Sequence, residues 1–72
     1  MEKIDLHGLT HSEAIDRAED FVLKHSVDNM FECKIITGGS NAMKNKIMSM
    51  LKKHNFKYFI PSWNLGEIIV SY

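Results

Sequence analysis

Two glycine-containing segments, at residues 7–10 and 37–41, each separate a stretch with strand periodicity from a stretch with helix periodicity. Polar and apolar residues alternate over 3–7 and again over 31–37, which predicts two short strands. Apolar residues at a spacing of three or four follow each glycine-containing segment, which predicts a helix in each case. A strand–helix order that occurs twice in 72 residues indicates an α/β domain.

The ends of the two helices are marked by residues that commonly cap helices. Thr10 opens a Thr-His-Ser-Glu sequence of capping-box form, so the first helix should cover about 11–26. Ser40 or Asn41 can cap the start of the second helix. Asn55 suits the left-handed residue that follows a helix, so the second helix should end just before it.

Two further strands complete the expected fold, at residues 56–60 and 67–72. Pro61 stops the first of these strands, and a turn at 63–66 predicts that the two form a hairpin. The first three strands should run parallel because helices with right-handed crossovers connect them. We therefore expect one α/β domain over 1–72: a β-α-β-α-β-β two-layer sandwich, with a four-stranded mixed sheet and two helices on one face.

The composition is that of an ordinary globular protein, with 44% hydrophobic and 25% charged residues. Cys33 is the only cysteine, which excludes an internal disulfide and a cysteine-rich metal site and fits a reducing compartment. We interpret Cys33 as a buried strand residue, and His25 and His54 as structural residues near helix C-termini. No apolar run reaches the ~20 residues that a membrane span needs, and the N-terminal residues do not resemble a signal segment, so we expect a cytoplasmic protein without membrane partners.

The charges are divided unevenly although the net charge is zero. Residues 1–33 carry three basic and eight acidic residues, a net charge of −5, whereas residues 34–72 carry six lysines and one acid, a net charge of +5. A basic face of this kind is typical of nucleic-acid binding. A second interpretation is that several of these lysines form the solvated face of the second helix.

Both glycine-containing segments leave the carboxyl end of a strand and enter a helix N-terminus, at the edge where ligands of α/β sheets bind. Free amides at helix N-termini favour phosphate, so we expect a phosphate-bearing ligand there. Asp5 and His7 are two residues apart on the first strand and should share a face, where the carboxylate could hold the imidazole for general acid–base chemistry. The alternative is that they are the polar face of a half-exposed strand.

Three segments resemble motifs of the Smr (small MutS-related) domain family. Residues 4–9, Ile-Asp-Leu-His-Gly-Leu, resemble the Leu-Asp-Leu-His-Gly opening of these domains. Residues 36–44, Ile-Thr-Gly-Gly-Ser-Asn-Ala-Met-Lys, resemble their second motif, a Thr/His-Gly-x-Gly loop followed by small residues and Leu-Arg. Residues 66–70, Gly-Glu-Ile-Ile-Val, resemble their closing Gly-x-x-Val strand. The resemblance covers nearly the whole chain and implies the same β-α-β-α-β-β order.

The second motif aligns with the family in two ways. Without a gap, Ser40 replaces the second glycine of the motif. With one residue deleted between Gly38 and Gly39, Gly39 takes that place. Met43 then matches the family's Leu, and Lys44 matches its Arg. We prefer the gapped alignment because it keeps the helix-facing Met43 and the basic Lys44 in phase.

The resemblance implies an endonuclease that cleaves the phosphodiester backbone of RNA or DNA, with RNA slightly preferred. It implies that Asp5 and His7 are the catalytic pair. Residues of the two loops and the helix starts are expected to bind phosphate and nucleic acid: Gly8, His11, Thr37, Gly38, Gly39, Ser40 and Lys44. A second interpretation of His11 is a solvated residue in the first turn of the helix.

No metal or other cofactor is expected, because no second acid or histidine is placed to complete a metal site around Asp5 and His7. Two alternatives to the endonuclease remain open. The first is a non-catalytic nucleic-acid-binding module with the same fold. The second is an interaction domain that docks onto a ribosome or a repair assembly.

Aromatic residues in the hairpin form a further candidate surface. Phe59 should share the sheet face opposite the helices with Lys57, and Lys34 could lie on the same face. With Trp63, Phe59 could stack nucleobases while the lysines hold phosphates. The alternative is that the aromatic residues pack within the hairpin or form a contact between the subunits of a homodimer.

Overall fold

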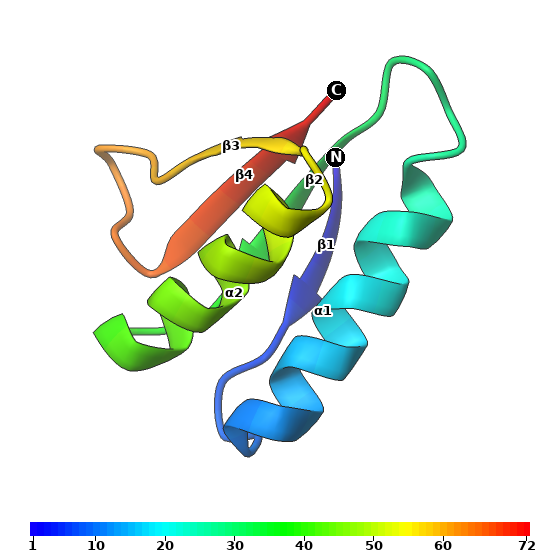
Figure 1. Ribbon diagram of the computed structural model, residues 1–72. Coiled ribbons are helices and arrows are strands. Elements are labelled where there is room, and N and C mark those ends of the chain that lie inside the picture. Colours follow the sequence, from blue (N-terminus) through cyan, green and yellow to red (C-terminus); the bar gives the residue numbers. More distant parts are fainter.

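Four strands and two helices follow one another in the predicted order, and their ends lie within two residues of the predicted ones. The computed structural model describes residues 1–72 (Figure 1). Its elements are β1 (Glu2–Asp5), α1 (His11–His25), β2 (Glu32–Ile36), α2 (Asn41–Lys53), β3 (Lys57–Phe59) and β4 (Glu67–Ser71). The α/β fold class is therefore confirmed.

The sheet has the strand order β1-β2-β4-β3. β1 and β2 are parallel, whereas β4 is antiparallel to both of its neighbours, β2 and β3. The first three strands thus point in one direction and β3 and β4 form a hairpin, as predicted. The sequence analysis did not specify that β4 lies between β2 and β3, which places the most apolar strand in the centre and the shortest at an edge.

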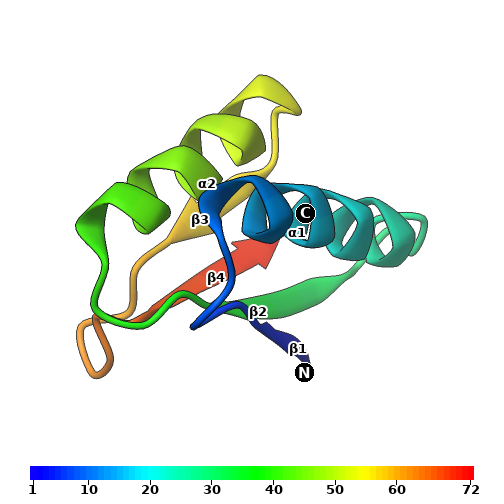
Figure 2. The same ribbon diagram turned by 90° about the horizontal axis from the view of Figure 1, so that it is seen from below.

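Both helices cover one face of the sheet (Figure 2). α1 faces the sheet with small and β-branched residues, and α2 faces it with longer apolar side chains. Together with side chains from one face of the strands they form a core of 13 buried residues: Leu6, Ala14, Ala18, Val22, Phe31, Cys33, Ile35, Met43, Ile47, Met50, Leu51, Ile68 and Val70. Neither helix has the length and the apolar composition that a membrane span requires.

The helix ends have the caps that the sequence predicts. The Thr10 hydroxyl accepts a hydrogen bond from the Glu13 amide at 3.2 Å and donates to the Glu13 carboxylate at 2.9 Å. Ser40, rather than Asn41, caps α2, because its hydroxyl accepts from the amide of Met43 at 3.1 Å. Asn55 adopts the left-handed conformation after α2, with φ of 63°.

A side-chain hydrogen bond joins the two helices, with Glu19 Oε2 on α1 2.7 Å from Nε2 of His54, the residue after α2. This contact supports the interpretation of His54 as a structural residue. It also fixes the C-terminal end of α2 against α1.

The sheet face opposite the helices is polar at its first two strands and apolar at its last two. The pairing register places Lys3, Lys34, Ile69 and Phe59 in one row across the sheet. Ile69 is 3% exposed although it lies outside the core beneath the helices. The row confirms that Phe59 shares this face with Lys34.

Cys33 is fully buried in β2, as predicted. Burial raises the pKa of its thiol to about 11, and the neighbouring Glu32 carboxylate contributes in the same direction. Because the thiolate is the reactive form, we expect Cys33 to react with Ellman's reagent at pH 8 only as the protein unfolds. The urea dependence of the reaction should follow the loss of circular dichroism. A fast reaction in a fully folded sample would contradict this expectation.

Candidate functional site

Three loops lie at the same end of the sheet, on the lower and left sides in Figure 1. One follows β1, one follows β2, and the third is the β3–β4 loop (residues 60–66). β1 and β2 end at this edge because they are parallel, and β4 begins at it because it is antiparallel to β2. The sheet therefore holds all three loops side by side.

A turn, rather than a strand, brings Asp5 and His7 together. β1 ends at Asp5, so the prediction that both residues alternate along one strand was wrong for His7. Asp5 Oδ1 accepts a hydrogen bond from the His7 amide at 3.1 Å and lies 2.7 Å from His7 Nδ1. An aspartate that accepts from the amide two residues ahead is typical of an Asx turn.

The Asp5–His7 pair stands on an open surface, with the side chains 50% and 73% exposed. The hydrogen bond from the His7 ring, followed by that from the His7 amide, holds the pKa of the Asp5 carboxyl below its ordinary value. An ionised Asp5 favours the tautomer of neutral His7 that carries its proton on Nδ1. Nε2 is then left as a proton acceptor that faces away from Asp5.

The loop after β2 lies directly against His7. Gly38 has a left-handed φ of +74°, and a Cβ on this residue would lie 3.6 Å from the Cβ of His7. Gly8, with φ of +81°, has the same conformation in the turn that follows His7. Both positions favour glycine.

The carbonyl oxygen of Gly66 holds the Thr37–Gly38 segment. It accepts hydrogen bonds from the amides of Thr37 at 2.8 Å and Gly38 at 3.1 Å, and the Thr37 hydroxyl lies 3.3 Å from it. Thr37 itself is buried. The amides of Thr37 and Gly38, which the sequence analysis assigned to phosphate, therefore point to Gly66.

Four consecutive amides remain without a partner in the protein, those of residues 39–42. The first two belong to Gly39 and Ser40, and the next two are the first amides of α2. Amides in this position at the positive end of a helix dipole are suited to bind a phosphate oxygen. Of the predicted phosphate-binding residues on this loop, Gly39 and Ser40 thus offer free donors.

Lys44 and His11 have less exposed positions than a ligand-binding role suggests. Lys44 is 7% exposed, and its Nζ donates a hydrogen bond to the carbonyl of Leu65 at 2.6 Å. His11 is the half-buried first residue of α1, and its ring has no hydrogen bond to Asp5 or His7. In this structure Lys44 therefore binds the β3–β4 loop through the Leu65 carbonyl.

The backbone carbonyls of Leu65 and Gly66 are the part of the site that the sequence analysis missed. A carbonyl is present in every residue, so no residue type marks the two that accept these bonds. The only feature of the sequence that marked this contact was Gly66 itself. A Cβ there would lie 3.3 Å from the carbonyl oxygen of Gly38, so the close approach of the two loops favours glycine.

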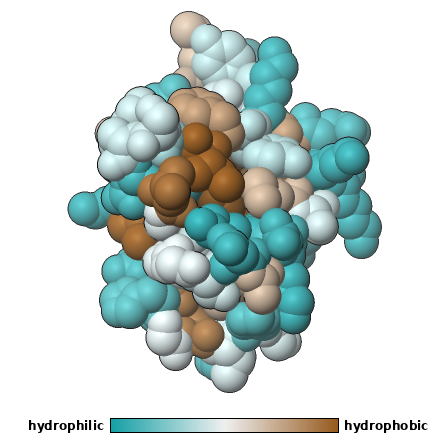
Figure 3. Space-filling model, turned by 90° about the vertical axis from the view of Figure 1, so that its left-hand side faces the viewer, coloured by the Kyte–Doolittle hydropathy of each residue, from teal (hydrophilic) through white to brown (hydrophobic).

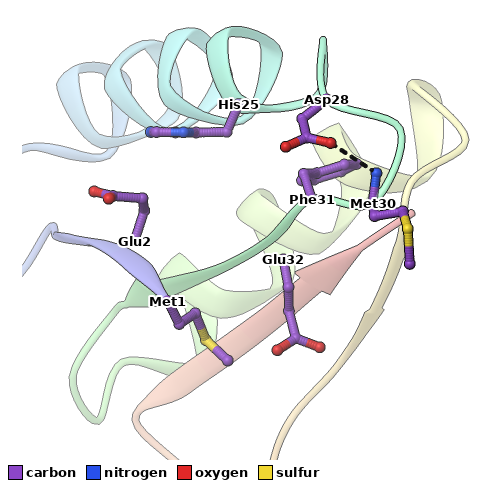
Figure 4. Close-up of a pocket in the computed structure, with 7 residues that line it drawn as sticks. All are labelled: Met1, Glu2, His25, Asp28, Met30, Phe31 and Glu32. Atoms are coloured by element: carbon purple, nitrogen blue, oxygen red, sulfur yellow. Dashed lines mark hydrogen bonds between the residues drawn. The ribbon is translucent and has the colours of Figure 1, made fainter.

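A hollow of about 270 Å³ lies at the opposite edge of the sheet (Figure 4). Its seven lining residues come from the starts of β1 and β2 and from the end of α1 and the loop that follows: Met1, Glu2, His25, Asp28, Met30, Phe31 and Glu32. It is therefore separate from the three loops.

A family model of the Smr domain matches residues 4–62, which include both the Asp5–His7 turn and the loop after β2. The chain therefore belongs to the Smr domain family, which is associated with nucleic-acid binding and nuclease activity. The match ends before residues 66–70, the segment that we compared with the closing strand of the family. Searches of curated proteins and of solved structures give no match.

The hydrogen bond between Asp5 and His7 should be visible in the titration of Asp5. Because the pKa of Asp5 is lowered in the folded protein, the pairing contributes stability above the ordinary pKa of the carboxyl. That contribution is lost as the pH falls through the lowered value. In His7→Ala, the Asp5 midpoint measured by carboxyl NMR should rise, but only part of the way, because the amide bond to Oδ1 remains. His11→Ala is the control and should leave the midpoint unchanged; an unchanged midpoint in both variants would contradict the pairing.

The bond from Lys44 to Leu65 should contribute to stability. Lys44→Met keeps the apolar stem but removes the donor, and we expect a loss of about 1.5–3 kcal/mol in the free energy of unfolding. Lys46→Met, on the exposed side of α2, should change it by less than about 0.5 kcal/mol. Urea unfolding measures both values, and NMR amide shifts of Gly38 and Gly66 report on the loops. Equal stability of the two variants would show that the Lys44 bond does not contribute to the free energy of unfolding.

Proposed function

We propose that this domain is an endonuclease that cleaves the phosphodiester backbone of nucleic acid, with RNA preferred to DNA. The observation that carries the proposal is the 2.7 Å contact between Asp5 Oδ1 and His7 Nδ1, which leaves Nε2 of the exposed His7 side chain without a partner. Membership in the Smr domain family supports the same class of activity.

On RNA, neutral His7 acts as a general base through Nε2. It removes the proton from a 2′-hydroxyl, and the 2′-oxygen attacks the adjacent phosphorus. The bond from phosphorus to the 5′-oxygen breaks, and that oxygen takes up a proton from water. The products are a 2′,3′-cyclic phosphate and a free 5′-hydroxyl. Asp5 stabilises the imidazolium that His7 becomes and does not itself transfer the proton.

The amides of Gly39 and Ser40 and the start of α2 supply the electrostatic part of the mechanism. Negative charge on the phosphate oxygens grows during the attack, and fixed backbone donors stabilise it without rearranging. Gly38 lies close to His7, so the donors that follow it in the chain are near the base. The exposure of the pair suits a polymer that lies across the edge, rather than a small molecule enclosed in a cavity.

One observation favours a second candidate, a nucleic-acid-binding module that does not cleave. The amides of Thr37 and Gly38 and the ammonium of Lys44 are all bonded within the protein. Fewer groups are then left to stabilise the transition state than the family motif implies. Docking onto a ribosome or a repair assembly, and a homodimer, remain further proposals for either candidate.

Cleavage assays with labelled single-stranded RNA, hairpin RNA and branched DNA test the proposal. His7→Ala should lower the rate of cleavage by about 10²–10⁴-fold, because it removes the general base. His25→Ala, at the far end of α1, is the matched control and should cleave like the wild type. We expect cleavage to persist in EDTA, because His7 carries the proton.

Two results would overturn the assignment in different ways. Equal cleavage by the wild type and His7→Ala would show that another group, or a contaminant, does the chemistry. Binding by both proteins without cleavage by either would favour the non-catalytic module. A steep fall of binding with salt would still indicate phosphate contacts in that case.

A further inference from the structure

The β3–β4 loop exposes two large apolar side chains. Trp63 is 74% exposed and Leu65 is 65% exposed, and Phe59, just before the loop, is also exposed. Figure 3 looks onto the side of the molecule where this loop lies and shows apolar side chains gathered there. Exposed apolar side chains that gather in one place mark a surface for a partner.

The loop that carries Trp63 is held in place on both sides. The Asn64 amide donates to the carbonyl of Pro61 at 3.2 Å, and the Gly66 amide donates to the Asn64 side chain at 2.9 Å. Pro61 is buried, and Lys44 bonds to the carbonyl of Leu65. Trp63 is therefore presented by an ordered backbone, and little conformational freedom is lost when a partner binds.

The same loop is continuous with the candidate catalytic edge. The Gly66 carbonyl bonds to the amides of Thr37 and Gly38, and Gly38 contacts His7. β4 is two strands away from β1 in the sheet, a separation of about 10 Å. A chain of nucleotides that lies along the edge would thus pass His7, the free amides of Gly39 and Ser40, and then the β3–β4 loop.

The half of the chain that carries the loop is basic, and this charge favours a polyanion over a basic or neutral face of another protein. Residues 34–72 carry six lysines and one acid, Glu67. Glu67 is 8% exposed, and its Oε2 lies 3.5 Å from Nζ of Lys34, so these two residues together add no net charge to the surface. Aromatic side chains among lysines bind single strands by stacking on bases while the lysines attract phosphates.

We infer that Trp63 stacks on an unpaired nucleobase next to the cleaved phosphate, so that the substrate is single-stranded where it crosses this edge. This inference rests on the proposed function, since cleavage is what places a phosphate at Asp5 and His7. Bases within a duplex are stacked on each other and cannot offer a free face to Trp63. The loop therefore selects single strands, hairpin loops or frayed ends.

The fluorescence of Trp63 tests the inference directly, because it is the only tryptophan in the chain. The His7→Ala protein, which should bind without cleaving, is titrated with a short oligouridylate and with an RNA duplex of similar length. We expect the single strand to quench the fluorescence with saturation and the duplex to have little effect at the same concentrations. Equal quenching by both would overturn the selection of single strands.

Three variants separate stacking from general apolar contact. Trp63→Ala should weaken binding of the labelled oligouridylate by about ten- to a hundredfold, whereas Trp63→Phe keeps an aromatic face and should bind within about threefold of the wild type. Val27→Ala is the control, because Val27 is an exposed apolar residue in the loop after α1, at the opposite end of the sheet, and it should bind like the wild type. Wild-type affinity in Trp63→Ala would overturn the inference. So would a fluorescence change that depends on protein concentration without RNA, which would identify a second copy as the occupant.

These experiments test the inference and the proposed function separately. If the wild type cleaves single-stranded RNA and Trp63→Ala cleaves it with the same kcat/KM, the stacking role is wrong and the nuclease stands. If no protein cleaves but the oligouridylate quenches Trp63, the nuclease is wrong and the nucleic-acid surface stands.

Discussion

The carbonyl of Gly66 is the acceptor on which the candidate site depends. It fixes the amides of Thr37 and Gly38, and Gly38 in turn lies against His7. A free loop of two glycines would sample many conformations, and ordering it would cost entropy at each binding event. The bonds to Gly66 remove that freedom in advance. They also turn the Thr37 and Gly38 amides toward Gly66, whereas the amides of Gly39 and Ser40 have no partner in the protein.

The position of β4 makes this contact available. A chain in which β3 followed β2 in the sheet would place the start of β4 farther from the loop after β2. Because β4 pairs with β2, Ile36 lies opposite Glu67 and Gly66 reaches the end of β2. Alternation along the sequence could predict the strand and its hairpin with β3, since both depend on local patterns. It could not predict that β4 lies between β2 and β3, because this order depends on which strand occupies the centre of the sheet. The burial of Ile69, on the face away from the helices, reflects this central position.

The same distinction between local and long-range contacts explains which site residues could be predicted. Asp5 and His7 are two residues apart and meet through a turn that Asp5 itself forms. Because the interaction is local, the pairing could be predicted from the sequence, although we expected it on a strand. Ser40 was predictable as a helix cap for the same reason. The contact of Lys44 was not predictable, because its partner is a backbone carbonyl 21 residues away. A lysine near a glycine-containing loop was instead interpreted as a phosphate ligand. The sequence pattern showed the charge of Lys44 but did not reveal that the side chain is buried.

The Asp5–His7 pair needs an explanation other than stability. Both side chains are at least half exposed, and a polar contact in that setting contributes little to folding because water competes for it. The turn does not need the imidazole, since the His7 amide bonds to Asp5 whatever side chain residue 7 carries. The ring nevertheless lies where Asp5 fixes one nitrogen, and the exposed side chain leaves the other nitrogen without a partner, close to the loop that contains Gly38. A histidine that the turn does not require, with one nitrogen held by an aspartate, supports the proposal that His7 performs acid–base chemistry on a phosphate.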